Sequence, residues 1–429
     1  MIRILFLFLG REIILRHWKT LFIIGVCWFL LGLGVFIDAL DGDTYLHPHT
    51  FAYFLLPEAA ISLLAAAGSD GTAKQMRIVQ GIALLAVSVL IFTSSAATNF
   101  LLALVFGLCF LIDGTMRIAS AWVVRFPRWK LGIAGGIFEL ILAIATLQPW
   151  PTWYEGTVGA NVGAVLILSS LGIIHVAWRI HSLEAGAPLS RLFGRSSLLS
   201  AITTHHHQPQ ATTKRGELIV HVWTPTGTAM TPLRQRAISR YIAAVDADGV
   251  ISTGHAALEL QPDLYISHYP AVEIDRSPNE FSRTLRATAD NNIEGRYLPD
   301  YRSEADGWCE STVQVIIKNI DEDKLRAFWS TYKADNTYNL TNRNCSSVVA
   351  DALDAALEGV YRHKRWPVFS AIRAIIYPEL WAASLIRKRA ESMAWTPGLV
   401  LDYARALSAI VDPKPGFWVP KEFLKTRSE

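Results

Sequence analysis

The chain has 429 residues, 51% of them hydrophobic, and its mean hydropathy of +0.27 is higher than that of a typical soluble protein. The formal net charge of +3 is too small and too dispersed for a nucleic-acid-binding protein. Four scattered cysteines give neither a disulfide framework nor the paired spacing of a zinc site. This composition favours a reducing compartment, in which a single thiol can stay free for chemistry.

The charged residues are distributed unevenly along the chain. Residues 1–180 hold 11 Lys and Arg and 9 Asp and Glu, whereas the rest of the chain holds 29 and 28, the remainder of the 40 basic and 37 acidic residues. The twofold difference in charge density indicates two domains in different solvents. We therefore predict a membrane domain over 1–180, a linker over 181–215, a polar domain over 216–360 and an amphipathic helical extension over 361–429.

Six apolar segments lie in the first half, each close to the ~20 residues that a helix needs to cross a bilayer. They cover residues 20–40, 50–67, 77–95, 99–123, 129–148 and 155–178. The second is short and contains Pro57 and Glu58. The pattern predicts an all-α polytopic membrane domain with six spanning helices.

The basic residues of the short loops predict the orientation of these helices. Four precede the first segment, and others lie between the second and third and between the fourth and fifth. The alternate loops, 41–49 and 149–154, contain no Lys or Arg. Because such residues stay in the cytoplasm, both termini should be cytoplasmic. No cleavable signal peptide is expected, since no small-residue cleavage site follows the first apolar run.

The short glycine-rich helices of this half resemble the HdeD family of bacterial six-helix membrane proteins over about residues 15–180. The similarity lies in "GIALLAVSVLIF", "FGLCFLIDGTMRIASAW" and "GGIFELILAIATL", with Trp and basic residues at the helix ends. The resemblance implies a bacterial inner-membrane protein loosely linked to acid stress, without a defined transport chemistry. The lipid bilayer is the expected partner, and association of copies through the membrane domain stays open.

Four ionisable side chains fall inside the apolar segments: Glu58, Asp113, Arg117 and Glu139. Such residues suggest function by default. Asp113 and Arg117 are four residues apart, the spacing of an ion pair on one helix. They either neutralise each other to fix helix packing or belong to a proton or substrate path, and the sequence leaves both interpretations open.

The linker and the polar domain differ in their local patterns. The linker contains "TTHHHQPQATTKR", in which His205, His206 and His207 cannot all face one ion, so we expect a solvated linker and no metal site. From residue 216, alternating runs such as "GELIVHVW", "GVISTGHAALEL", "DLYISHYP" and "STVQVIIKNI" predict strands. Helices are predicted over "DEDKLRAFWSTYK", capped by Asp321 or Asn319, and after Cys345, so the domain should be α+β.

Cys345 is the candidate nucleophile. It opens a helix whose apolar stripe runs along Val348, Val349, Ala352, Leu353, Ala356 and Leu357. A thiol in the first turn is favoured as thiolate by the helix dipole and free N–H groups. Asn344 can cap this helix, and the Cys345 N–H can stabilise an oxyanion. The alternative is that Cys345 is only a small buried hydrophobe.

His255, which follows Gly254 in a predicted strand, is the candidate base. Gly254 would let a substrate or a neighbouring backbone come close. A hairpin about residues 261–262 would place His255 opposite His268, which could orient its ring. A shift of one residue would move His268 to the other face, in which case Glu259 is the alternative orienter.

The remaining candidates near the site have weaker signals. Arg343 either steers an anionic substrate and stabilises the thiolate or is an ordinary surface residue. Tyr269, like Tyr265, is expected to pack or to line the cleft. Cys309 and His221 are expected to be structural.

The order of "GHAALEL", "YISHYP" and a late "NC" at a helix start resembles the circularly permuted papain-like fold over about residues 216–360. The lecithin–retinol acyltransferase family and permuted relatives of NlpC-type peptidases share this order. The resemblance implies that His255 is the base, Cys345 the nucleophile and His268 the third member, although some bacterial relatives have an aromatic residue at the third position. It implies no metal or organic cofactor.

These features predict a membrane-anchored thiol hydrolase facing the cytoplasm, a peptidase or amidase that acts through an acyl-enzyme. The alternatives are a lipid deacylase or acyltransferase, or a non-catalytic stress-related protein with a binding module. The expected substrates are peptides, amides or acyl lipids, and not nucleic acid. In the extension over 361–429, basic clusters interleaved with Trp, Ile and Leu suit a helix at the headgroup boundary, or one docked on the protein.

Overall fold

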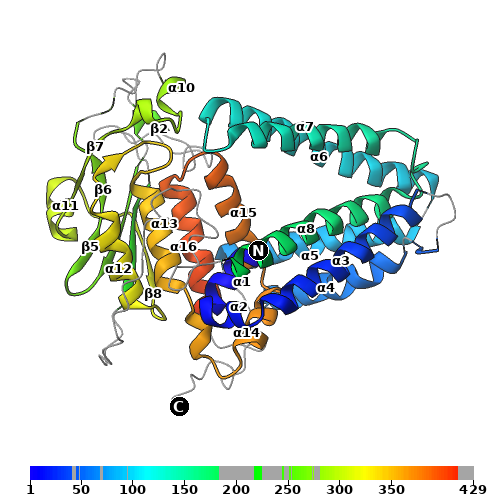
Figure 1. Cartoon of the computed structure of the whole chain (residues 1–429), viewed down its shortest axis with the longest axis horizontal. Helices are drawn as coiled ribbons and strands as arrows, with labels where there is room; N and C mark the ends of the chain where they lie inside the picture. The colour runs from blue at the N-terminus through cyan, green and yellow to red at the C-terminus, as the bar shows by residue number, and fades with distance from the viewer. Residues whose placement is uncertain are drawn as a thin grey trace.

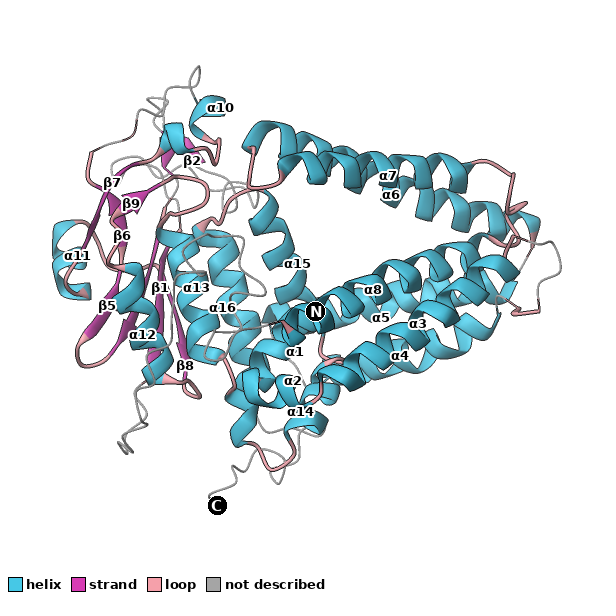
Figure 2. Ribbon diagram, in the orientation of Figure 1, coloured by secondary structure: helices cyan, strands magenta, loops and turns pink. Residues whose placement is uncertain are grey.

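The computed structural model describes residues 1–40, 45–47, 49–67, 71–93, 95–182, 217–224, 244–245, 251–252, 254–272, 274 and 281–413. Apart from residues 181 and 182, the predicted linker lies outside these ranges, and so do His205, His206 and His207. A bundle of long helices adjoins an α+β domain that contains the strands (Figures 1 and 2). The predicted division into a helical N-terminal part and an α+β C-terminal part is therefore confirmed.

Six long helices form the bundle in three antiparallel pairs, α3 with α8, α4 with α5, and α6 with α7. They are α3 (Trp18–Asp38), α4 (His49–Ala67), α5 (Gly71–Thr93), α6 (Ala96–Val124), α7 (Trp129–Leu147) and α8 (Thr157–His181). Four of them, α3, α6, α7 and α8, are long and apolar enough to cross a membrane. The other two contain shorter apolar stretches, His49–Leu64 and Arg77–Thr93. The chain thus has the helices of a membrane protein, but six spans are not confirmed.

Close contact between α3 and α8 depends on glycine. A Cβ atom at Gly163 would lie 2.7 Å from the backbone nitrogen of Phe36, and one at Gly32 would lie 2.8 Å from Cβ of Leu166. Small residues at such crossings let two backbones approach, which is how helices pack where no hydrophobic force acts between them.

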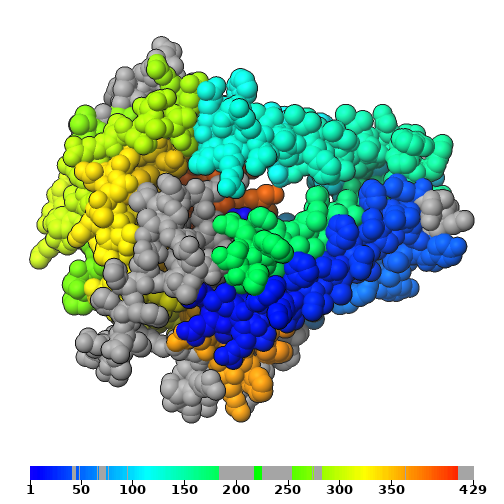
Figure 3. Space-filling model, in the orientation of Figure 1, coloured from blue at the N-terminus to red at the C-terminus, as the bar shows by residue number. Residues whose placement is uncertain are grey.

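The α6–α7 hairpin contacts α8 through a hydrophobic cluster that contains Leu102 and Val158 and through the Thr146–Asn161 hydrogen bond, and Figure 3 shows an opening between the hairpin and α8 elsewhere along their length. Arg117 on α6 lies 3.2 Å from the Asp113 carboxylate and 2.5 Å from the Glu139 carboxylate on α7. Glu58 on α4 accepts a hydrogen bond from Gln80 on α5. The expected Asp113–Arg117 pair is thus formed, and Glu139 is a second partner of the same guanidinium group.

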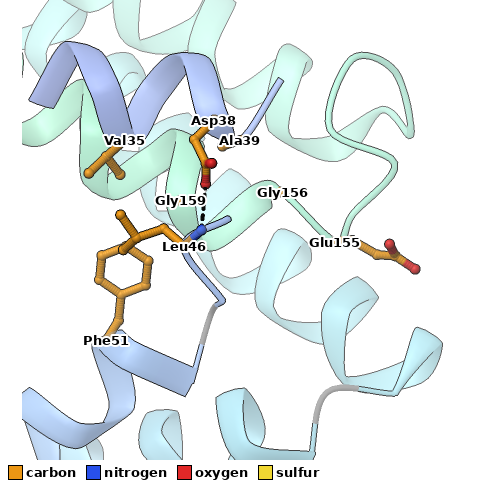
Figure 4. Close-up of a pocket in the computed structure, with 8 residues that line it drawn as sticks. All are labelled: Val35, Asp38, Ala39, Leu46, Phe51, Glu155, Gly156 and Gly159. Atoms are coloured by element: carbon orange, nitrogen blue, oxygen red, sulfur yellow. Dashed lines mark hydrogen bonds between the residues drawn. The ribbon is translucent and has the colours of Figure 1, made fainter. Parts of the chain in front are cut away.

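The bundle ends remote from the α+β domain hold a small pocket (Figure 4). The Asp38 carboxylate accepts the backbone N–H groups of Tyr45 and Leu46, at 2.9 and 3.0 Å. The two hydrogen bonds hold the described part of the α3–α4 connection against the end of α3.

The strands of the α+β domain form two larger sheets. A four-stranded antiparallel sheet has the order β5-β4-β1-β8, and a three-stranded sheet has the order β6-β7-β9. The strands are β1 (Leu218–Trp223), β4 (His255–Leu260), β5 (Leu264–Ile266), β6 (His268–Pro270), β7 (Ile293–Tyr297), β8 (Val313–Ile317) and β9 (Thr337–Tyr338), beside the short pair β2 (Ala244–Val245) and β3 (Ile251–Ser252). The single strand expected over "DLYISHYP" is divided at Ser267, where the chain passes from one sheet to the other.

One hydrophobic core joins the sheet to helices from both ends of the chain. Side chains of β1, β4, β5 and β8 pack on α13 (Cys345–Leu357) and α16 (Pro397–Val411). The same core contains Ile4, Leu5 and Phe8 of the N-terminal helix α1 (Ile2–Leu9). The other helices among the described residues are α2 (Arg11–Arg16), α10 (Phe281–Thr284), η1 (Ala289–Asn291), α11 (Tyr301–Gly307), α12 (Glu322–Tyr332), η2 (Val360–His363), α14 (Pro367–Ala374) and α15 (Pro378–Ser392).

Candidate active site

Helix α13 begins at Cys345, the candidate nucleophile, and Asn344 caps it as predicted. The Asn344 side chain accepts the N–H of Ser347, and the Ser347 hydroxyl approaches the Asn344 N–H to complete a capping box. The amide nitrogen of Asn344 also donates to the carbonyl groups of Leu340 and Trp395. Because all its polar atoms are engaged, Asn344 fixes the position of Cys345 and is not placed to bind a substrate.

The Cys345 thiol lies between the helix start and the first residues of β4. Only 8% of the residue is exposed. The sulfur interacts with the His255 side chain and with the backbone N–H of Ala256, and it lies 3.7 Å from the Ser346 hydroxyl. The structure therefore brings together the two residues on which the predicted chemistry depends.

His255 opens β4 directly after Gly254, whose φ of +71° is a conformation that side chains with a Cβ rarely adopt. The imidazole stacks on the ring of Tyr269 at a centroid distance of 4.0 Å. Its Nε2 lies 2.9 Å from the Ser267 hydroxyl and 3.1 Å from the Glu304 carboxylate. These contacts occupy Nε2, so we infer that Nδ1 is the nitrogen that faces the sulfur.

The predicted register of the hairpin is wrong by one residue. β4 pairs with β5 through Leu258 with Ile266 and Leu260 with Leu264, so the residue numbers of paired partners sum to 524. The predicted pairing of His255 with His268 requires a sum of 523. The shift turns His268 away from His255. Its Nδ1 lies 3.0 Å from the Tyr332 hydroxyl, and its strand pairs with β7. His268 therefore does not orient the His255 ring.

Glu259, the alternative orienter, also lies elsewhere, because its carboxylate is 2.9 Å from Nε2 of His221. His221 is buried and stacks on Tyr301, in accord with the structural role expected for it. Cys309 as a residue is exposed. The pKa of its thiol is raised by the partial loss of solvent around the sulfur and by the nearby Glu304 carboxylate. It is therefore poorly suited to act as a thiolate at neutral pH.

Glu304 takes the orienting position, and sequence reasoning missed it. It lies on α11, whose N-terminus Asp300 caps, and only 2% of the residue is exposed. One oxygen accepts the Tyr269 hydroxyl and the other accepts the Tyr265 hydroxyl, each at 2.6 Å. The Asp300 cap signals a short helix, but no local pattern indicates which acidic residue of that helix points inward.

The two tyrosines hold the Glu304 carboxylate in position by hydrogen bonds. Burial and the neighbouring carboxylate raise the pKa of both Tyr265 and Tyr269, so each hydroxyl stays protonated and donates a hydrogen bond to Glu304. Tyr269, expected to pack or to line the cleft, thus holds both the ring of His255 and its acidic partner.

Electrostatics favour an ion pair between the thiol and the imidazole. Burial alone lowers the pKa of His255, but the Cys345 thiolate and Glu304 outweigh it, so that pKa lies above the ordinary 6.5. Burial alone raises the pKa of Cys345, but His255, Ser346 and the Ala256 N–H outweigh it, so that pKa lies below the ordinary 9.0. Both shifts favour the thiolate and imidazolium form of the pair, which is the reactive form of a cysteine nucleophile.

Arg343 is a buried structural residue and not a surface arginine. Its guanidinium lies 4.0 Å from the centre of the Tyr332 ring and donates to the carbonyl groups of Thr337 and Tyr332. Burial and this positive charge lower the pKa of His268 to about 3, so that imidazole is neutral. Arg343 therefore shapes the loop before the nucleophile and is not placed to steer a substrate.

The loop before Cys345 is also tied to the membrane helices. Thr341 donates to the carbonyl of Leu285 at 2.8 Å, and Ala287 donates to the carbonyl of Val124, the last residue of α6, at 2.7 Å. A short segment that contains Leu285 and Ala287 thus connects the turn of the α6–α7 hairpin to the loop before Cys345.

In comparisons of the chain with known proteins, no family model matched it, and neither a curated protein nor a solved structure gave a significant match.

Proposed function

We propose that the chain is a membrane-anchored thiol hydrolase, a peptidase or amidase, whose α+β domain resembles the permuted papain-like fold and whose helical domain resembles the HdeD family. The observation that carries the proposal is the buried Cys345–His255 pair with Glu304 behind the imidazole. The basic loops favour a cytoplasmic position for this domain. The resemblance to the HdeD family favours the bacterial inner membrane for the helices.

The reaction begins with attack of the Cys345 thiolate on the carbonyl carbon of an amide or ester. The carbonyl oxygen takes the electron pair, and the backbone N–H of Cys345 at the helix start stabilises it. The His255 imidazolium gives its proton to the leaving amine or alkoxide, which leaves a thioester. His255 then takes a proton from water, which attacks the thioester and releases the acid and the thiolate. No step of this sequence needs a metal or an organic cofactor.

A lipid deacylase or acyltransferase is the second candidate, and one contact favours it. The hydrogen bond between Ala287 and Val124 joins the segment next to the nucleophile loop directly to the end of an apolar helix. A substrate that stays in the bilayer would then have a short path to Cys345. In a transferase, an acceptor hydroxyl or amine would replace water in the second step.

Labelling with an electrophilic probe for reactive cysteines tests the proposal. The wild-type chain should be labelled at Cys345, Cys345→Ala should lose the label, and His255→Ala should be labelled at least about tenfold more slowly, because the cause of the lowered thiol pKa is gone. Cys309→Ser is the matched control, since it removes an exposed thiol of raised pKa, and it should be labelled like the wild type.

A label on Cys309, or none on Cys345, would mean that the site is not a nucleophile and would favour a binding module. If Cys345 is labelled, incubation with peptide libraries and with lipid extracts, followed by mass analysis of the products, separates the two enzyme classes. New peptide termini or freed amines support the hydrolase, and deacylated or transacylated lipids support the second candidate.

A further inference from the structure

Helix α14 exposes large apolar side chains and buries small ones, which is the reverse of the usual arrangement in a soluble protein. Val368, Ile372 and Ile376 recur at helical spacing along α14 and the turn after it, and each is 47 to 57% exposed. The opposite face is made of the buried alanines 371 and 374. In water this arrangement would leave the largest apolar groups solvated and bury the smallest, so the outer face needs an apolar partner.

The position of α14 indicates which partner covers it. Its inner face packs on α1 and η2, and α1 continues through α2 into the apolar helix α3. The next helix, α15, meets α14 at 77°. Glu379 in the first turn of α15 binds Arg77 near the start of α5 at 3.0 Å, with both side chains largely buried. The bent pair therefore lies across the ends of the bundle, where the apolar helices meet the polar domain (Figure 1).

Aromatic and basic residues border the apolar face. Trp366 precedes the helix and is exposed, and the Trp381 indole donates to the carbonyl of Ile375 at the bend. Lys364 and Arg365 lie just before α14, and Arg373 lies in its last turn. Apolar residues beside Trp and basic residues are typical of helices that lie in the headgroup region of a bilayer containing anionic lipids.

We propose that the outer face of α14 is buried in the leaflet that borders the α+β domain, as an in-plane anchor that supplements the spanning helices. The anchor binds a lipid surface with anionic headgroups: the apolar side chains enter the upper acyl region, and the basic residues stay among the phosphates. Its purpose follows from its packing, since α14 rests on α1 and η2, which directly follows the nucleophile helix α13. The anchor thus holds the catalytic domain at a fixed height over the bilayer, whatever bond that domain cleaves.

Spin labels on the full-length chain test the anchor. The four native cysteines are replaced, single cysteines are introduced as Ile372→Cys or Val368→Cys, and the labelled protein is placed in vesicles of phosphatidylcholine with phosphatidylglycerol. Both labels should collide readily with dissolved oxygen, and their collisions with a water-soluble nickel complex should fall by about tenfold relative to a solvated site.

The matched control is Ile316→Cys on β8. This isoleucine is 45% exposed, like those on α14, but it lies on the sheet, away from the bundle. Its label should stay accessible to the nickel complex. If the labels at 368 and 372 are as accessible to nickel as that at 316, the anchor does not exist. If they are protected but show spin–spin broadening that vanishes on dilution with unlabelled protein, a second copy covers α14 and the proposal is wrong.

Discussion

Glu304 places a buried carboxylate 3.1 Å from the imidazole of His255, and its charge is one of the causes that raise the pKa of that imidazole. Glu304→Gln keeps the shape of the side chain but removes the charge; its amide oxygen accepts one tyrosine hydroxyl, and its NH2 group has to donate to the other. The pKa of His255 should therefore fall, the imidazolium should be lost at lower pH, and the alkaline limb of Cys345 labelling should move to lower pH. At neutral pH the labelling rate should fall by about tenfold, the effect of one pKa unit.

Glu259→Gln is the control for this substitution. It removes a carboxylate from β4, the strand that carries His255, but the lost charge faces His221. The pH profile of Cys345 labelling should keep its alkaline limb. Equal shifts in the two variants would show that the general charge of the sheet, and not Glu304, governs the imidazole.

The roles at the residue scale were predictable to different degrees. Cys345 and Asn344 were found because a helix start has a local signature of cap, thiol and apolar stripe. His255 was found through its neighbouring glycine and strand pattern. Glu304 and the true position of His268 were not, because both depend on tertiary structure. One residue of strand register decides which face His268 takes, and Glu304 reaches His255 from a helix 49 positions away.

At the scale of elements, the cap of α13 should control both stability and reactivity. Asn344→Ala removes the acceptor for the Ser347 N–H and the donor to two buried carbonyl groups. We expect a loss of about 2 kcal/mol in the free energy of unfolding and slower labelling of Cys345, because the first turn loses its fixed position. Denaturant unfolding in detergent and probe kinetics measure the two effects.

Asp321→Ala is the matched control, because Asp321 caps α12 in the same way by accepting the N–H of Lys324. It should lower stability by about 1 kcal/mol and leave Cys345 labelling unchanged. Should both variants slow labelling equally, the effect would reflect general destabilisation and not the position of the thiol.

The elements themselves followed closely from local pattern. α12 and α13 begin at their predicted caps, and β1, β4 and β8 lie within the predicted runs. The strand over "DLYISHYP" was predicted as one element because the chain stays extended through Ser267, and only tertiary pairing divides it between two sheets. Among the apolar helices, the described stretches of α4 and α5, His49–Leu64 and Arg77–Thr93, are shorter than a full span, so the count of spans is not fixed by helix number.

At the scale of the whole molecule, the N-terminal helix belongs to the core of the C-terminal domain. Phe8 is fully buried and packs on Tyr361, and the N–H of Gly359 donates to the carbonyl of Leu7. Nothing local in the sequence predicts this contact, because it joins segments about 350 positions apart and the first apolar residues resemble an extension of the membrane segment.

Phe8→Ala should therefore destabilise the α+β domain by about 3–5 kcal/mol, although the residue lies before the first spanning helix. Phe138→Ala on α7 is the control, since that ring is largely exposed on the bundle and should have little effect on the domain. Limited proteolysis of the α+β domain in vesicles measures the difference. Equal resistance of both variants would place α1 outside the domain core.

The charge state of the Cys345–His255 pair can be measured directly through the absorbance of the thiolate at ~240 nm. This absorbance is followed as a function of pH and taken as the difference between the wild type and Cys345→Ala. Because His255 lowers the pKa of Cys345 below the ordinary 9.0, the thiolate should form at a lower pH than that of an ordinary cysteine. In His255→Ala its titration should move to higher pH, since burial of the sulfur is then opposed only by Ser346 and the Ala256 N–H. A thiolate that forms only at or above pH 9.0 in the wild type, and at the same pH without His255, would contradict the proposed site.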